Sequence, residues 1–146
     1  MLTKKYCPFL IRYVSKLDIA KIEKMNKEAG LSLNHDQLLV ALKDIDCVVL
    51  SIEYKEIFIG YAVYKKKDKF IKLLDICIDP YYRRQGAGTA ILDYIKKCGA
   101  FRLNKKIMCC ADEYSLELHL FLRANGFKCT SINKYGEYKF QYEQMD

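Results

Sequence analysis

The sequence predicts an α/β domain built around a mixed β-sheet of about seven strands with helices on both faces. Segments that alternate apolar and polar residues are interleaved with segments whose apolar residues recur every three to four positions, in the order β-α-α-β-β-β-α-β-α-β-β. Some strands are joined by short turns and others by helices, so the sheet should combine hairpins with crossovers. The chain has 146 residues, of which 51% are hydrophobic, which is enough for one core. We therefore expect a single domain over residues 1–146.

The first half of the chain should supply two helices and four strands. The expected elements are a strand at 9–14, helices at 16–28 and 36–43, and strands at 47–54, 57–64 and 70–78. Ile22 and Met25 share one helical stripe, and Asn34 is a suitable N-cap for the second helix. Lys55-Glu56 is expected to turn the first hairpin, and the basic run at 65–67 is expected to form the next turn.

The second half should supply two helices and three strands. The expected elements are a helix at 86–98, a strand at 106–110, a helix at 114–124, and strands at 127–132 and 138–142. The helix at 86–98 has the clearest pattern, because its apolar residues fall at i, i+4, i+7, i+8 and i+11. Asn125-Gly126 is a typical helix C-terminus.

The net charge, the length of the apolar runs and the cysteine content exclude some classes of protein and favour others. The formal net charge of +7 predicts an anionic partner. No stretch approaches the roughly 18 apolar residues of a membrane span, and Arg12 interrupts the apolar N-terminal stretch, so we expect neither a membrane segment nor a signal peptide. Four of the seven cysteines (Cys47, Cys77, Cys109 and Cys110) lie in apolar runs, which indicates reduced core thiols of a cytoplasmic protein. The spacing of His and Cys predicts no metal site.

The residues with the strongest chemical signal lie where the strand at 70–78 leads into the helix at 86–98. The strand is followed by a basic loop containing Arg83 and Arg84, and Gly86 and Gly88 begin the helix. Glycines allow a close approach of the backbone to a ligand, and the first N–H groups of a helix have no partner within it. The positive end of the helix dipole and the two arginines add attraction for an anion. The junction therefore predicts a phosphate or pyrophosphate site.

Two well-known phosphate-binding loops do not match this junction. No Lys-Ser or Lys-Thr pair follows Gly88, as a P-loop requires. Ile91 stands where the dinucleotide-binding fingerprint has its third glycine. The anion site must therefore belong to another kind of loop.

Residues 78–88 (Ile-Asp-Pro-Tyr-Tyr-Arg-Arg-Gln-Gly-Ala-Gly) resemble the acyl-CoA signature Q/R-x-x-G-x-G/A of the GNAT superfamily of N-acyltransferases, together with its preceding V-D-P-x-x-R. Residues 120–127 (Leu-Phe-Leu-Arg-Ala-Asn-Gly-Phe) are similar to the second signature of that family, and residues 60–63 resemble its preceding hairpin. The resemblance covers about residues 46–142. Within the superfamily, the pattern is most similar to the ribosomal-protein-alanine (RimI-like) N-acetyltransferases.

The resemblance implies a GNAT fold in which acetyl-CoA, the acyl donor substrate, lies in a V-shaped splay between strands four and five. It implies that the pantetheine pairs with the backbone of strand four, and that the pyrophosphate takes N–H groups of the glycine-containing junction. The cofactor-binding residues implied in this way are Ile76, Cys77, Ile78, Arg83, Arg84, Gln85, Gly86, Ala87, Gly88 and Thr89.

The implied reaction is direct attack of a primary amine on acetyl-CoA in a ternary complex. An α-amine with a pKa of about 8 is roughly 10% neutral at pH 7, whereas a lysine with a pKa of about 10.4 is neutral only about once in 2,500. The difference of about 3 kcal/mol favours an α-amine when a site has few groups for proton transfer. We expect the acceptor to be a protein N-terminus or a small amine, with a ribosome- or tRNA-linked acceptor left open.

The groups that transfer protons are not settled by the resemblance. The tyrosine that in the family often donates to the thiolate falls at Leu122, the asparagine near the start of that helix falls at Ser115, and a common base position falls at Cys110. The remaining catalytic candidates are Glu113, before the last helix, and Asp75, on strand four. Glu113 could instead stabilise the first turn of the helix, and Asp75 could face solvent.

Two other functions are compatible with the sequence. The chain could be a non-catalytic or degenerate module that binds acyl-CoA or RNA, because it contains the lysine runs 65–67, 96–97 and 105–106. It could also be a GNAT toxin that acetylates the amine of an aminoacyl-tRNA, for which a basic surface is suitable. In each case we expect no membrane partner and a monomer or a homodimer.

Overall fold

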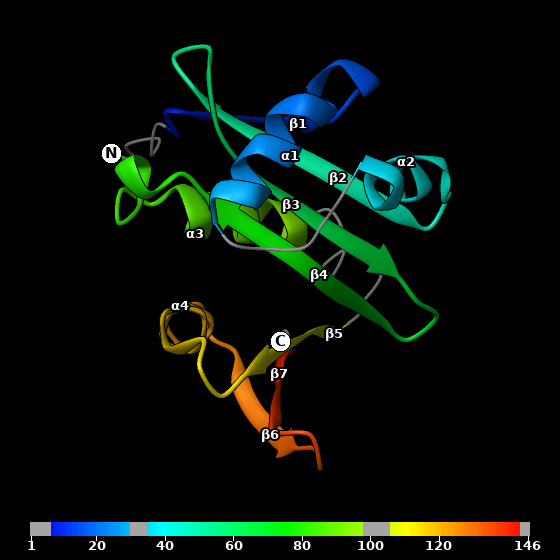
Figure 1. The fold of residues 1–146 in the computed structure, drawn as a ribbon. Helices are drawn as coiled ribbons and strands as arrows, with labels where there is room; N and C mark the ends of the chain where they lie inside the picture. Colours follow the sequence, from blue (N-terminus) through cyan, green and yellow to red (C-terminus); the bar gives the residue numbers. More distant parts are fainter. Residues whose placement is uncertain (1–6, 30–34, 98–105, 144–146) are drawn as a thin grey trace.

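The computed structural model describes residues 7–29, 35–97 and 106–143. Their strands form one mixed sheet in the order β1-β2-β3-β4-β5-β7-β6 (Figure 1). The strands are β1 (Phe9–Tyr13), β2 (Cys47–Tyr54), β3 (Ile57–Lys66), β4 (Phe70–Ile78), β5 (Lys106–Asp112), β6 (Lys128–Ile132) and β7 (Glu137–Tyr142). The helices are α1 (Ile19–Glu28), α2 (His35–Lys43), α3 (Ala87–Ile95) and α4 (Leu116–Ala124), with short 3₁₀ helices η1 (Lys16–Asp18) and η2 (Pro80–Tyr82). The predicted fold class and element order are confirmed.

The sheet separates into two halves between β4 and β5. This is the one parallel pair among the described strands, and it is short, since it joins Phe70–Leu73 only to Lys106–Cys109. Beyond these residues β4 continues for five residues to Ile78 and β5 for three to Asp112 without pairing to each other. Figure 1 shows the halves diverging there, with α4 beside β5–β7. One edge of the end of β4 therefore has no paired strand.

A bulge in β4 sets which side chains face which helices. Val63 of β3 is paired with Asp75, but the next residue, Tyr64, is paired with Leu73, so Leu74 is an extra residue. Leu73 packs into the core on the α3 side of the sheet, whereas Leu74 and Asp75 line a pocket beside α2. The bulge thus brings two consecutive side chains to the α2 side.

Two apolar cores cover the faces of the sheet. One lies between the sheet and helices α3 and α4 and contains Leu50, Ile91 and Phe140. The other lies between the sheet and helices α1 and α2 and contains Ile22 and Leu38. Figure 1 shows α1 and α2 on the near side of the sheet and α3 behind it. The end of β4 therefore has one helix pair on each side.

The structure shifts several predicted boundaries. The helix expected at 16–28 begins as the 3₁₀ turn η1, because the Asp18 carboxylate accepts hydrogen bonds from the backbone N–H and the hydroxyl of Ser15. The turn expected at 65–67 is wrong, since β3 extends through Lys66 and Lys65 forms an ion pair with Asp44. The proposed N-cap Asn34 lies outside the described residues.

The cysteines that the sequence places in the core fall into different environments. Cys77 and Cys109 are buried, and burial raises the pKa of Cys77 to about 11 and of Cys109 to about 12, so both are thiols at neutral pH. Cys47 is half-buried. The prediction is wrong for Cys110, which is exposed because successive residues of a strand face opposite sides. Within the described residues, every helix is too short or too polar to cross a lipid bilayer.

Candidate functional site

The turn after β4 is fixed by Asp79. Its backbone N–H donates to the carbonyl of Ile59 at 2.8 Å, which ties the turn to β3. Its carboxylate accepts the backbone N–H of Tyr81 at 2.9 Å, and Pro80 begins η2, where a missing N–H costs nothing. The Asp-Pro pair in the sequence therefore sets the direction in which the chain leaves the sheet toward α3.

The residues before α3 form an open anion cradle, which we define as the backbone from Arg84 to Thr89. Arg84 and Gly86 both have left-handed backbone angles, with φ of 62° and 88°. The helical bonds begin with the N–H of Ala90, which donates to the carbonyl of Gly86 at 2.9 Å, so the preceding N–H groups have no partner within the helix. A Cβ at Gly86 would meet no atom within 4 Å. The cradle is therefore accessible and carries the positive end of the helix dipole.

Gly88, which is also part of the cradle, lies against α4. A Cβ at this position would lie 2.8 Å from Cε1 of Phe121 in α4. Such a contact is far inside normal packing distance, so the glycine lets α3 and α4 come together. Gly86 therefore allows the left-handed turn of the cradle, and Gly88 leaves room for the Phe121 side chain of α4.

Arg83 connects the two halves of the sheet across their divergence. Its Nε donates to the carbonyl of Ile78, the last residue of β4, at 3.0 Å. Its Nη1 lies 3.5 Å from Oε2 of Glu117 in the first turn of α4. The guanidinium is therefore next to the cradle, but its free end is directed toward a carboxylate on the other half.

Asp75 belongs to a buried hydrogen-bonded network on the α1 side. Asn26 Nδ2 donates to the Tyr61 hydroxyl at 2.7 Å, and that hydroxyl donates to Asp75 Oδ2 at 2.7 Å. Asn26 Nδ2 also lies 3.3 Å from the same carboxylate oxygen. Burial raises the pKa of Asp75, and hydrogen bonds from Tyr61 and from the backbone of Ile76 oppose that shift. Burial and the neighbouring carboxylate raise the pKa of Tyr61 above its usual value. The result is a positioned carboxylate with increased proton affinity.

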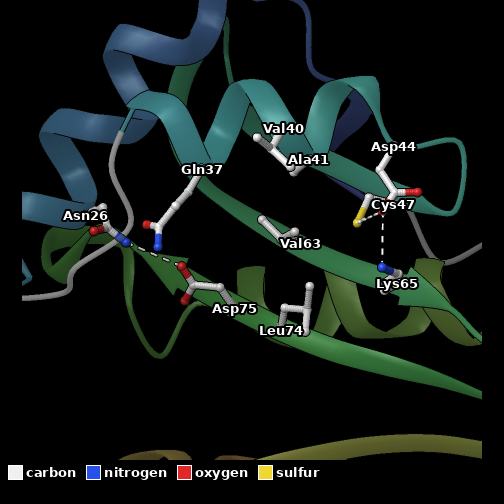
Figure 2. Close-up of a pocket in the computed structure, with 10 residues that line it drawn as sticks. All are labelled: Asn26, Gln37, Val40, Ala41, Asp44, Cys47, Val63, Lys65, Leu74 and Asp75. Atoms are coloured by element: carbon white, nitrogen blue, oxygen red, sulfur yellow. Dashed lines mark hydrogen bonds and ion pairs between the residues drawn. The ribbon is translucent and has the colours of Figure 1, made fainter.

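A pocket of about 480 Å³ lies between α2 and strands β2–β4, with Asp75 at one end (Figure 2). Its lining residues come from α1, from α2 and the turn after it, and from strands β2, β3 and β4, and they are Asn26, Gln37, Val40, Ala41, Asp44, Cys47, Val63, Lys65, Leu74 and Asp75. Figure 2 shows the apolar members between the polar end at Asp75 and the Asp44–Lys65 ion pair at the opposite end, where the two charges are 3.1 Å apart. From one end to the other, the pocket therefore contains the Asp75 carboxylate, an apolar stretch and the neutralised Asp44–Lys65 ion pair.

A family model described as "Acetyltransferase (GNAT) domain" matches residues 34–129. This range includes β4, the anion cradle and α4, and it spans more than half of the chain. The chain belongs to the GNAT acetyltransferase family. The resemblance carried by residues 78–88 and 120–127 is thereby confirmed.

Solved structures share this GNAT fold along almost the whole chain. Ard1 from Thermoplasma volcanium has a TM-score of 0.82 at 16% identity, covering 96% of this chain and 100% of the other. The ribosomal-protein-S18-alanine N-acetyltransferase from Escherichia coli has a TM-score of 0.79 at 13% identity, covering 92% and 93%. NAA60 from Arabidopsis thaliana in complex with acetyl-CoA has a TM-score of 0.81 at 12% identity, covering 93% and 99%. At these identities the likeness shows the fold. No curated protein sequence matches the chain.

Two of the three positions that differ from the usual GNAT pattern have structural roles here. Leu122, at the position of the usual tyrosine, is fully buried in the core beneath α4. Ser115 donates from its hydroxyl to the Asp112 carboxylate at 3.0 Å, which also accepts the backbone N–H of Tyr114. Cys110 is exposed on β5. Leu122 packs and Ser115 holds the turn before α4, so neither takes over the role that the family gives its position.

The structure does not bring the two catalytic candidates together. Asp75 faces α1 from β4, whereas Glu113 is exposed on the turn after β5. The Glu113 carboxyl carbon lies 4.0 Å from where a Cβ on Gly136 would be, so this side chain leans toward the β6–β7 turn. The candidates therefore occupy opposite sides of the divergence in this GNAT chain.

Sequence reasoning missed the groups that hold Asp75. Tyr61 and Asn26 are fully buried, yet they lie 14 and 49 residues from Asp75 along the chain. A buried tyrosine needs a partner for its hydroxyl, which is a signal that a partner exists but not which residue it is. Only the packing of α1 on the sheet brings these three side chains into contact.

Proposed function

We propose that the chain transfers an acetyl group from acetyl-CoA to a primary amine by direct attack within a ternary complex. The observation that carries the proposal is the course of β4 through the site. Beyond Leu73 its free edge runs past Asp75 toward the anion cradle at Gly86. A thioester held along that edge would have its phosphates at the cradle and its reactive end near a positioned carboxylate.

The residues of this chain fit the coenzyme at both ends. The backbone of Ile76, Cys77 and Ile78 lies on the part of β4 that β5 does not cover, so it is suited to the pantetheine amides. The cradle N–H groups, joined by Arg83 and Arg84, are suited to the pyrophosphate. Acetyl-CoA supplies the activated acyl group, and the protein supplies its alignment with the amine.

We assign Asp75 the role of accepting the proton of the attacking amine. Its orientation is fixed by Tyr61 and Asn26, and its pKa is raised by burial, which suits a base working near neutral pH. Glu113 is the second candidate, and its exposed turn gives it no comparable support. With Leu122 at the usual tyrosine position, we assign protonation of the leaving thiolate to water.

The lysines that suggested a nucleic-acid surface are partly committed to internal contacts. Lys96 is buried, donates to the carbonyl of Asn125 at 2.8 Å and lies 4.3 Å from the centre of the Tyr142 ring. Lys65 is paired with Asp44. These contacts favour a catalytic protein over a charge-driven binding module. The structurally similar Escherichia coli enzyme is named for an alanine of a ribosomal protein, which supports a protein α-amine as the acceptor.

The test is release of free CoA by the purified protein with acetyl-CoA and a panel of acceptors. The panel should contain peptides with a free N-terminus, peptides with a blocked N-terminus and one lysine, polyamines and charged tRNA. We expect turnover with α-amines above the rate of acetyl-CoA hydrolysis. Acetyl-CoA binding without turnover on any acceptor would instead identify a non-catalytic module.

A further inference from the structure

We propose that the pocket beneath α2 receives the first residue of a peptide acceptor, with the α-amine at Asp75 and an aliphatic side chain of leucine or methionine size along Val40 and Leu74. This inference rests on the proposed function and names its acceptor class. It concerns the α2 side of β4 (Figure 2), and none of the residues that line the pocket belongs to the anion cradle.

The charges of the pocket favour an acceptor with a single ammonium group. Among the described lining residues, Asp44 and Asp75 are the acidic ones. Asp44 is already bound by Lys65 at 3.1 Å and by the backbone N–H of Asp46 at 2.9 Å, and these contacts hold its pKa below the usual value. Asp75 has acceptor capacity beyond its bonds to Tyr61, Asn26 and the backbone N–H of Ile76, because a carboxylate offers about four lone-pair sites. One carboxylate is thus available to hold one ammonium.

The apolar stretch of the pocket favours an aliphatic side chain. Val40 is 67% exposed on α2, and Leu74 is 47% exposed on the bulge of β4. Val63 and Ala41 lie between them along the pocket wall (Figure 2). Covering such surface with apolar atoms is favourable, by about 25 cal/mol per Å² of apolar area removed from water. An acceptor with a polar or missing side chain would leave this surface in water.

The length of the stretch sets the size of the side chain. Asp75 is paired with Val63 on β3, and Lys65 lies two residues farther along the same strand. Two residues of a strand span roughly 7 Å. From its α-amine, an extended methionine side chain nearly covers this length, and a leucine side chain, which is one bond shorter, covers most of it. Alanine and serine end well before the Asp44–Lys65 pair. Leucine and methionine fill the apolar stretch without bringing a second charge to that pair.

The experiment compares kcat/KM for peptides that differ only in their first residue, which is Ala, Ser, Leu, Met or Glu. We expect Leu and Met to exceed Ala and Ser by roughly tenfold or more, in line with methylene discrimination in apolar pockets. Calorimetry of the same peptides with the CoA-saturated protein should give the same order without depending on turnover. A small free amine such as isoamylamine tests whether the rest of the peptide contributes.

Two variants link the preference to this pocket. Ala41→Phe should fill the pocket and lower kcat/KM for Leu peptides at least tenfold, with little change for Ala peptides or in the KM for acetyl-CoA. Val40→Asp makes a milder change at an exposed position, and it should weaken Leu peptides selectively. Ile45→Asp is the matched control, because Ile45 is 89% exposed near α2 and is not among the lining residues.

The outcomes separate this inference from the proposed function. Turnover that is equal for Ala and Leu peptides, or a Leu preference unchanged in Val40→Asp, would overturn the pocket assignment and leave the acetyltransfer intact. Equal activity on isoamylamine and the Leu peptide would overturn the peptide acceptor. Release of CoA with none of the amines, together with peptide binding that ignores the first residue, would overturn both proposals.

Discussion

The two sides of β4 present different kinds of surface. On the α3 side, the anion cradle consists of consecutive residues whose backbone N–H groups precede the first hydrogen bond of the helix. On the α2 side, the pocket is assembled from side chains of α1, α2 and strands β2–β4, which are brought together by packing. The cradle thus depends on local backbone conformation at Gly86, and the pocket depends on the tertiary structure.

This difference bears on specificity. Backbone groups present the same chemistry whatever the neighbouring side chains are, so a cradle of this kind suits a constant substrate such as a coenzyme. Side chains such as Val40 and Leu74 can change without altering the fold, so the pocket is where an acceptor preference can be set. Changes at the cradle should therefore affect coenzyme binding and spare the acceptor, and changes at the pocket should do the reverse.

The largest effect is expected at the cradle. Gly86→Glu should lower the affinity for acetyl-CoA by roughly a hundredfold or more, because it places a negative charge at the phosphate site and a side chain at a φ of 88°. Calorimetric titration with acetyl-CoA measures the effect. Gly86→Asn is the matched control, because asparagine tolerates left-handed angles and adds no charge, so its loss should be much smaller. Unaltered affinity in Gly86→Glu would contradict the coenzyme assignment.

The next effect should fall on the acceptor side. Asp75→Asn should lower kcat/KM for the amine by about a hundredfold, which is typical of a general base, and leave the affinity for acetyl-CoA unchanged. A base works when it is deprotonated, and the pKa of Asp75 is raised, so activity should fall on acidification at a pH above the usual carboxylate range. The pH profile of kcat/KM checks both statements.

Glu113→Gln is the competing variant in the same measurement. If Asp75 is the base, the profile of Glu113→Gln should keep its acidic limb and that of Asp75→Asn should lose it. The reverse pattern would assign the base to Glu113 on the turn after β5. Tyr61→Phe adds a positioning control, because it removes one bond to the carboxylate without removing the carboxylate itself.

The cradle could be predicted from the sequence, whereas the side-chain contacts on the α2 side of β4 could not. The cradle is visible in the sequence because Asp79-Pro80, the arginines and Gly86 are contiguous, and each has a local geometric role. The Asn26–Tyr61–Asp75 network was not predictable, since it depends on the register of β3 on β4 and on the packing of α1. The sequence places Gly88 in the junction, but its closeness to the Phe121 side chain depends on how α4 packs in the folded chain.

The sequence also does not show which lysines have partners within the fold. Lys65 and Lys96 look like solvated residues in the sequence, because neither the Asp44 partner nor the Asn125 carbonyl is near in the chain. Lys96 is buried and donates to the Asn125 carbonyl, and this burial lowers its pKa. Net charge counts residues, whereas only the structure shows which charges remain available to a partner.

A third prediction concerns the frame of the acceptor side. Arg12 forms a two-bond contact with Asp18 at 3.0 Å and also binds Glu53, which ties β1 and β2 to the start of α1. The Arg12 hydrogen bonds lower the pKa of Asp18 to about 2 from 3.8. A carboxylate with a lowered native pKa stabilises the fold above its unfolded pKa, and this stability is lost as pH falls through the native pKa.

Asp18→Asn should therefore lower the free energy of unfolding by about 2 kcal/mol at pH 7. Urea unfolding curves of the two proteins should differ fully above pH 3.8 and converge as the pH approaches 2. The affinity of the folded variant for acetyl-CoA should be unchanged, because the contacts of Arg12 with Asp18 and Glu53 do not involve the cradle. A stability difference that is independent of pH would show that Asp18 acts through packing alone.

The smallest effect should come from the ion pair that spans the divergence. Arg83 Nη1 is directed toward Glu117 on α4, so the carboxylate competes with the coenzyme phosphates for this guanidinium. Exposed pairs contribute up to about 1 kcal/mol, so Glu117→Gln should raise the affinity for acetyl-CoA by a factor of roughly two to five. Because such pairs are screened by ions, the gain should shrink at high salt.

Calorimetry at two salt concentrations measures this gain, and Glu143→Gln is its matched control. Glu143 is also exposed and pairs with Lys106 at 3.9 Å, so its removal changes the net charge equally without involving Arg83. An equal gain in both variants would mean that overall charge attracts the coenzyme. A gain confined to Glu117→Gln would mean that Arg83 must leave α4 to bind phosphate, and that coenzyme binding alters the link between the two halves of the sheet.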